Sequence, residues 1–83
     1  MALKVYVAVT VHFTMEGKVI PMSFIWEDGK IYHIGKIKEI SRLDGSRPGE
    51  SRIMYTCIVN GRDTHLYYEN GSRGRWFLER RSA

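Results

Sequence analysis

This chain lacks a second cysteine, a long apolar run and any internal repeat. Its single cysteine, Cys57, excludes an internal disulfide framework and a thiolate zinc site. No apolar stretch approaches the roughly 20 residues of a membrane span, so no membrane partner is expected. A domain of 83 residues without disulfide bonds or a structural zinc site must be stabilised by a well-packed core, by a partner, or by both.

The first fourteen residues are apolar enough to suggest a signal peptide, but their pattern excludes one. Every second residue from Val5 to Val11 is a valine, and Phe13 continues this series of one parity. The residues of the other parity are more polar. A signal peptide does not alternate in this way, and no small-residue cleavage site follows before Glu16. Because the lone thiol also fits a reducing compartment, we expect a cytoplasmic protein.

Composition indicates one small globular domain over residues 1–83. The charged fraction is 27 % and the hydrophobic fraction 43 %, which argues against disorder. Thirteen Lys and Arg against nine Asp and Glu leave a net charge of +4. This charge excludes an acidic-tail protein and permits, without requiring, an anionic partner.

Five dipeptides in which an acidic or amide residue precedes glycine divide the chain. They are Glu16-Gly17, Asp28-Gly29, Asp44-Gly45, Asn60-Gly61 and Asn70-Gly71. Asn-Gly and Asp-Gly favour type I′ hairpin turns, because both central residues of such a turn need positive φ. With β-branched and aromatic segments between them, they predict an all-β fold, a six-stranded antiparallel meander curled into a small barrel or barrel-like sheet.

Two residues interrupt the predicted strands. Pro21 has no N–H, so it must lie at an edge, at a bulge or near the start of its strand. Gly35 breaks the alternation, and apolar residues then recur every three positions from Ile37 to Leu43. This pattern favours a strand bulged at Gly35, with one short helical turn near 36–43 as the alternative.

The predicted core takes one parity from each strand. It comprises Val5, Val7, Val9, Val11, Ile20, Met22, Phe24, Trp26, Ile34, Ile37, Tyr55, Cys57, Val59, Leu66, Trp76 and Leu78. Several strands also have apolar residues of the other parity, such as Met54 and Ile58. Either a strongly curved sheet or a dimer that covers the second face accounts for them.

No constellation of chemically active side chains stands out. His12, His33 and His65 are the plausible bases or metal ligands, but their spacing matches no metal or protease motif. Cys57 has the parity of the core, so we expect a buried structural thiol. We therefore predict no catalytic, cofactor or metal site and no small-molecule substrate. The enzyme alternative requires two of these four residues to meet in one pocket.

Basic residues are distributed unevenly along the chain. All five lysines precede residue 39 and all eight arginines follow it. If Trp76 and Leu78 face inward, then Arg75 and Phe77 face outward, and Tyr67 takes the outward parity of the preceding strand. The predicted partner-binding residues of this C-terminal face are Tyr67, Arg73, Arg75, Phe77, Arg80 and Arg81. Exposed aromatics beside arginines are typical of single-strand binders; the alternative is that the aromatics pack against each other or a dimer mate.

Several scattered motifs carry a resemblance. In chain order they begin with Pro21, then Trp26 directly before an acidic-Gly turn, then Tyr32-His33-Ile34. Further along the chain come an Arg-x-x-Tyr motif that begins at Arg52 and the segment Arg-Trp-Phe-Leu-Glu at residues 75–79. Over residues 18–80 the chain resembles small bacterial β-proteins of uncharacterised function. The resemblance implies a curled antiparallel sheet and assigns no catalytic residue.

These observations together predict a non-enzymatic interaction module with a protein partner or a homodimer. Nucleic acid, or a nucleic-acid-associated protein, is a further candidate partner through the C-terminal face. The alternative is a homo-oligomeric structural domain that binds no nucleic acid.

Overall fold

The computed structural model describes residues 2–44, 51–69 and 74–81, in which every regular element is a β-strand. The seven strands are β1 (Ala2–Phe13), β2 (Val19–Ile25), β3 (Ile31–His33), β4 (Lys36–Asp44), β5 (Ser51–Val59), β6 (Arg62–Glu69) and β7 (Arg75–Arg81). The predicted all-β class is confirmed, with seven strands in place of six. These residues form no helix that is long and apolar enough to cross a membrane.

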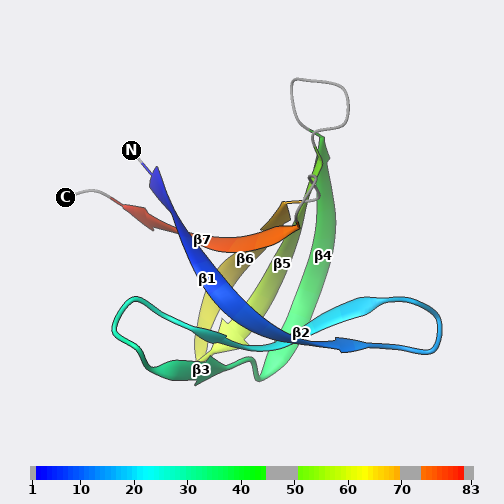
Figure 1. Cartoon of the computed structure of the whole chain (residues 1–83), viewed down its shortest axis with the longest axis horizontal. Helices are drawn as coiled ribbons and strands as arrows, with labels where there is room; N and C mark the ends of the chain where they lie inside the picture. Colours follow the sequence, from blue (N-terminus) through cyan, green and yellow to red (C-terminus); the bar gives the residue numbers. More distant parts are fainter. Residues whose placement is uncertain (1, 45–50, 70–73, 82–83) are drawn as a thin grey trace.

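All seven strands belong to one sheet with the order β3-β2-β1-β7-β6-β5-β4, which curls into a half-barrel (Figure 1). Strand β1 is shared, because residues 2–7 pair with β7 whereas residues 8–13 pair with β2. The sheet therefore bends along β1, and β2 and β3 run across the direction of β4 and β5 in Figure 1.

The two edge strands, β3 and β4, are consecutive in the chain and are joined by Ile34 and Gly35. The Ile34 N–H donates to the Met22 carbonyl oxygen at 2.9 Å, and the Gly35 N–H donates to the Ile58 carbonyl oxygen at 2.8 Å. This linker is thus hydrogen-bonded to β2 on one side of the opening and to β5 on the other. At this point the chain itself bridges the two sides of the half-barrel.

The stretch around Gly35 corrects the sequence prediction. The helical turn near 36–43 is wrong, because Lys36–Asp44 is a strand that pairs with β5. A single bulged strand does not form either, since the chain changes its pairing partner at Gly35 from β2 to β5. The ladder irregularity falls later, between Ile37 and Glu39. The change of partner adds the seventh strand.

The clearest turn prediction is confirmed at Asn60-Gly61. Asn60 has a φ of 52° and Gly61 a φ of 76°, so both central residues have the positive φ of a type I′ turn. This two-residue turn joins β5 directly to β6 and places Arg62 opposite Val59. The predicted turns at Asp44-Gly45 and Asn70-Gly71 include residues outside the described part of the chain.

The core lies on the inner face of the curled sheet. Its buried members are Phe24, Tyr55, Cys57, Val59, Leu66, Trp76 and Leu78, all of them predicted. Tyr55 reaches across the core, and its hydroxyl donates to the Val19 carbonyl oxygen at 3.0 Å. This bond ties β5 to β2, two strands that are far apart in the sheet order.

Met22 is the clearest error in the predicted core, because its side chain is 49 % exposed. Pro21 lies opposite Val11 and Ser23 lies opposite Thr10, so Met22 has no directly opposite residue on β1. This is a β-bulge, which is one of the three locations predicted for Pro21. The extra residue shifts the alternation and turns Met22 out of the core.

Candidate functional site

The aromatic residues of the predicted C-terminal face form a stack on the outer side of the sheet. Phe77 pairs with Tyr67 on one side and with Tyr6 on the other. The Tyr67 and Phe77 rings are stacked with centroids 4.9 Å apart, and Tyr6 meets Phe77 edge-on at 5.8 Å. The predicted parity is correct. The expected exposure of Phe77 is wrong, since its exposed fraction is 0 %, and the two rings pack against each other, as the alternative prediction states.

The cations of this face are engaged with neighbouring side chains. The Lys4 ammonium lies 2.9 Å from the Glu69 carboxylate, and an Arg75 guanidinium nitrogen lies 3.5 Å from it. The Arg75 guanidinium also lies 4.3 Å from the centroid of the Tyr6 ring, in cation–π geometry. The hydrogen bond from Lys4, with smaller contributions from Tyr6 and Arg75, lowers the pKa of Glu69. Glu69 therefore links β6 to both β1 and β7.

Of the other predicted residues of this face, Arg80 is separate from the stack. Its guanidinium pairs with the Glu27 carboxylate at 3.0 Å and so ties β7 to the end of β2. Arg73 and the side chain of Arg81 lie outside the described residues. The structure therefore brings together Tyr67, Phe77 and Arg75 and leaves Arg80 apart.

A second feature, which the sequence did not indicate, is the place where β6 and β7 separate. The two strands are paired only where residues 67–69 face residues 75–77. Among the described residues, 62–66 have β5 as their only ladder partner, and 78–81 have only β1. We call these two diverging segments the β6–β7 fork; Figure 1 shows β6 and β7 running apart.

A groove of about 630 Å³ lies at this fork. Its apolar wall consists of Phe24, Trp26, Tyr32, Val59 and Leu78. Phe24 is buried and stacks on Tyr32 with ring centroids 5.5 Å apart, while Trp26 and Tyr32 are half-buried. Two partly accessible aromatic rings therefore border an open space, as is usual for ligand-binding surfaces.

The polar rim of the groove comprises Asn60, Arg62, Thr64 and Glu79. Asn60 and Arg62 are there because the two-residue turn places them at the end of the β5–β6 hairpin. The rim carries one cation and one carboxylate, so its formal charge is balanced. Burial is the main reason why the pKa of Tyr67 is raised, and the nearby Glu79 carboxylate adds to the effect, so Glu79 already has one neighbour at the apex of the fork.

The turn beside the groove is fixed by an aspartate. The Asp28 carboxylate accepts a hydrogen bond from the Lys30 backbone N–H and another from the Tyr32 hydroxyl, both at 2.9 Å. The Lys30 bond is the main reason why the pKa of Asp28 is lowered, and the bond to Asp28 raises the pKa of Tyr32. Tyr32 is thereby held in place at the groove wall.

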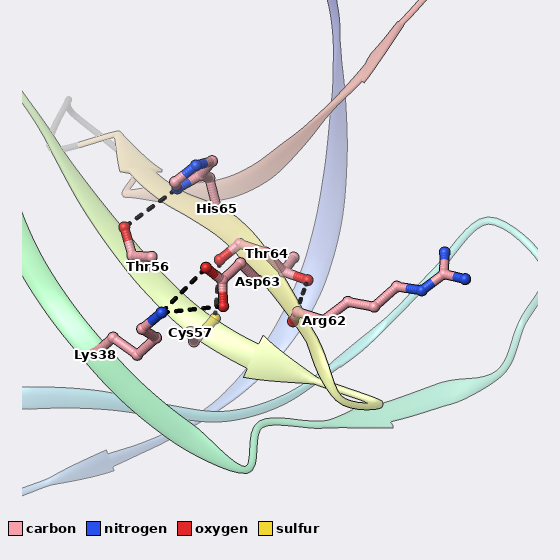
Figure 2. Close-up of polar contacts among 7 residues, drawn as sticks. All are labelled: Lys38, Thr56, Cys57, Arg62, Asp63, Thr64 and His65. Atoms are coloured by element: carbon pink, nitrogen blue, oxygen red, sulfur yellow. Dashed lines mark hydrogen bonds and ion pairs between the residues drawn. The ribbon is translucent and has the colours of Figure 1, made fainter.

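The reactive side chains do not converge. Figure 2 shows His65 beside Thr56, with 3.2 Å between the His65 Nδ1 and the Thr56 Oγ1, and Asp63 paired with Lys38. Cys57 faces the core from the neighbouring ladder position, so it lies on the opposite side of the sheet from His65. Burial raises the pKa of the Cys57 thiol, which disfavours a nucleophilic thiolate.

The remaining histidines, His12 on β1 and His33 on β3, are exposed. Within residues 2–44, 51–69 and 74–81, no three His, Cys, Asp or Glu side chains are grouped so that they could hold a metal ion.

The sequence pattern predicts Phe24 and Trp26 in the core but indicates no role for Arg62, Thr64 or Glu79. The fork depends on where the β6–β7 ladder stops, which no local pattern encodes. The one useful signal is the Asn60-Gly61 turn, because it fixes Arg62 at the end of a hairpin.

Comparison with known proteins gives no match to a protein family, to a curated protein or to a solved structure. The resemblance to small bacterial β-proteins therefore stays a prediction.

Proposed function

We propose that this chain is a non-enzymatic interaction module and that the groove at the β6–β7 fork is its ligand-binding site. The observation that carries the proposal is the half-buried Trp26–Tyr32 wall facing a rim of hydrogen-bonding groups across a 630 Å³ space. Aromatic surface supplies apolar contact, and a few polar groups supply orientation. We place the module in the cytoplasm on the basis of its lone thiol, with a protein as its principal partner.

The chemistry of the lining supports binding over catalysis. Among the described residues that line the groove there is no histidine, cysteine or serine, and Glu79 is the one carboxylate. A hydrolytic or group-transfer site needs a nucleophile or base with a second group that orients it. The groove's aromatic rings and balanced charge suit recognition of a ligand.

The C-terminal face supports nucleic-acid binding less well than sequence alone indicated. Phe77 is covered, and the Arg75 guanidinium already lies over the Tyr6 ring and beside Glu69. A base would have to displace these groups before it could stack. Nucleic acid stays a second candidate at this face because Arg75 and Arg80 are more than half exposed.

Homo-oligomerisation is the structural alternative, and one pair of residues favours it. Ile25 and Ile31 lie opposite each other on β2 and β3 and are 45 % and 59 % exposed. A second copy of the chain that covers this pair would remove its apolar surface from water. Sedimentation of the chain across a concentration range tests this alternative.

The two tryptophans provide a direct test of the groove. Trp26 lines the groove, whereas Trp76 lies in the core against Tyr55 and Tyr68. In ¹H–¹⁵N spectra, free indole at millimolar concentration should shift the Trp26 indole N–H signal and leave that of Trp76 in place. A fifteen-nucleotide oligothymidylate at low salt should leave both in place.

Two results would contradict the proposal. The first is an unshifted Trp26 signal with indole present. The second is oligothymidylate binding that weakens steeply with salt and is abolished by Arg75→Glu with Arg80→Glu, which would assign the function to the C-terminal face.

A further inference from the structure

Resting on the proposed function, we propose that the β6–β7 fork receives an extended polypeptide segment, which adds to the sheet as a strand along the free edge of β6. The groove then holds the side chains of that segment on the inner face.

The free edge follows from the alternation of an antiparallel ladder. Arg62 and Val59 flank a two-residue turn and form a hydrogen-bonded pair, so Thr64 and Leu66 also direct their backbone groups to β5. Asp63 and His65 must then direct their N–H and C=O groups away from β5, towards the fork. Among the described residues neither of them has a ladder partner on that side.

The opposite side of the fork has the same property. Phe77 lies between Tyr67 on β6 and Tyr6 on β1, and the next residue, Leu78, pairs with Val5 on β1 alone. By the same alternation, the backbone groups of Glu79 point into the fork. Residues 62–66 span about 17 Å at 3.4 Å per residue, which suits a segment of about five residues. An added strand satisfies backbone groups from both sides of the fork.

Side-chain chemistry selects a peptide over a polynucleotide. Alternate residues of an added strand point to one face of the sheet, so every second side chain would contact the Trp26 and Tyr32 rings. The exposed Arg62 guanidinium suits one carboxylate of the segment. A polynucleotide instead carries a negative charge at every nucleotide, and the groove lining offers one cation against the Glu79 carboxylate.

Selection from a phage-displayed library of random ten-residue peptides tests the proposal on the full chain. We expect enriched peptides with alternating apolar or aromatic residues and an acidic residue. Synthetic versions should shift the Trp26 indole signal and slow hydrogen exchange at the amides of Asp63, His65 and Glu79. N-methylation of alternate peptide amides should abolish binding.

A proline pair supplies the matched variants. His65→Pro removes the N–H that faces the fork and leaves the β5 ladder bonds of Thr64 and Leu66 in place. Arg42→Pro removes an outward N–H from β4, the opposite edge of the sheet, away from the groove. We expect His65→Pro to weaken peptide binding by about tenfold, the consequence of one lost hydrogen bond, and Arg42→Pro to bind as wild type. If His65→Pro does not fold, the N-methylated peptides decide the same question.

The outcomes separate the two proposals. Peptides that shift Trp26 but protect none of the three amides, and that bind His65→Pro normally, would overturn strand addition and leave the groove as the site. A library that enriches nothing while indole still shifts Trp26 would overturn the polypeptide as ligand. The polypeptide would also be overturned as the ligand if oligothymidylate slowed hydrogen exchange at the three amides. The same holds if self-association of the chain alone slowed that exchange. Failure of indole itself to shift Trp26 would overturn the proposed function.

Discussion

Tyr67 and Phe77 lie face to face with their ring planes 9° apart, at the last paired position before β6 and β7 separate. The stack covers Phe77 completely and holds the apex of the fork closed. The opening between the two strands therefore begins directly after this stacked pair.

Removing the Phe77 ring should destabilise the protein strongly. Phe77→Ala deletes a fully buried ring with two aromatic neighbours, and we expect it to lower the free energy of unfolding by about 3–5 kcal/mol. Phe13→Ala is the matched control, since Phe13 is 68 % exposed and its loss should cost about 0.5 kcal/mol or less. Urea denaturation measures both, and equal losses would contradict the buried position of Phe77.

Gly74 should tolerate alanine less well than Gly17. Both have positive φ, 59° and 84°, so each alanine bears the cost of a left-handed conformation, about 1 kcal/mol. A Cβ at Gly74 would also collide with the Tyr68 hydroxyl, whereas a Cβ at Gly17 meets no atom within 4 Å. Gly74→Ala should therefore lower Tm further than Gly17→Ala. Adding Tyr68→Phe should bring the two losses closer together, and an unchanged gap would argue against the collision.

Stability should fall in acid partly through Glu69. The pKa of Glu69 is lower in the folded protein than its ordinary value of 4.5, so the unfolded chain binds the proton more tightly. The contribution is complete above pH 4.5 and is lost as the pH falls through the folded value. Glu69→Gln should therefore lose less stability than wild type between pH 7 and pH 3 in urea titrations. Glu16→Gln, in an exposed turn, should behave as wild type, and identical pH profiles for all three proteins would refute the role of Glu69.

Cys57 should be unreactive until the protein unfolds. Its side chain is fully buried, its Sγ lies 3.5 Å from the Thr64 carbonyl oxygen, and burial raises the pKa of the thiol. Because the thiolate is the reactive form, labelling by an aromatic disulfide reagent at pH 8 should be more than about a hundredfold slower than in denaturant. Rapid labelling of the folded protein would contradict the buried position.

Local chemistry made much of the fold predictable. The Asn60-Gly61 turn and the alternation of β1 depend on neighbouring residues, and both are found as expected. The core position predicted for Met22 is wrong because a β-bulge at Pro21 shifts the alternation of side chains along β2. That bulge depends on how β2 pairs with β1. The split at Gly35 likewise depends on two partners that are distant in the sequence.

The candidate site was less predictable for the same reason. Phe77 appeared exposed from its parity, but Tyr6 reaches it from a strand some seventy residues earlier in the chain. The groove exists because β6 pairs with β7 over three residue pairs only, and the sequence of β6 itself gives no indication of where that pairing stops.

The division of β1 between two partners also determines the order in which the fold can be completed. Residues 8–13 find β2 within a short hairpin, whereas residues 2–7 must wait for β7, almost the whole described chain away. Closing so long a loop is entropically costly, and non-local pairing of this kind slows folding. Residues 2–7 therefore stay without their ladder partner until β7 has been synthesised, and an unpaired strand edge of this kind is open to pairing with other chains.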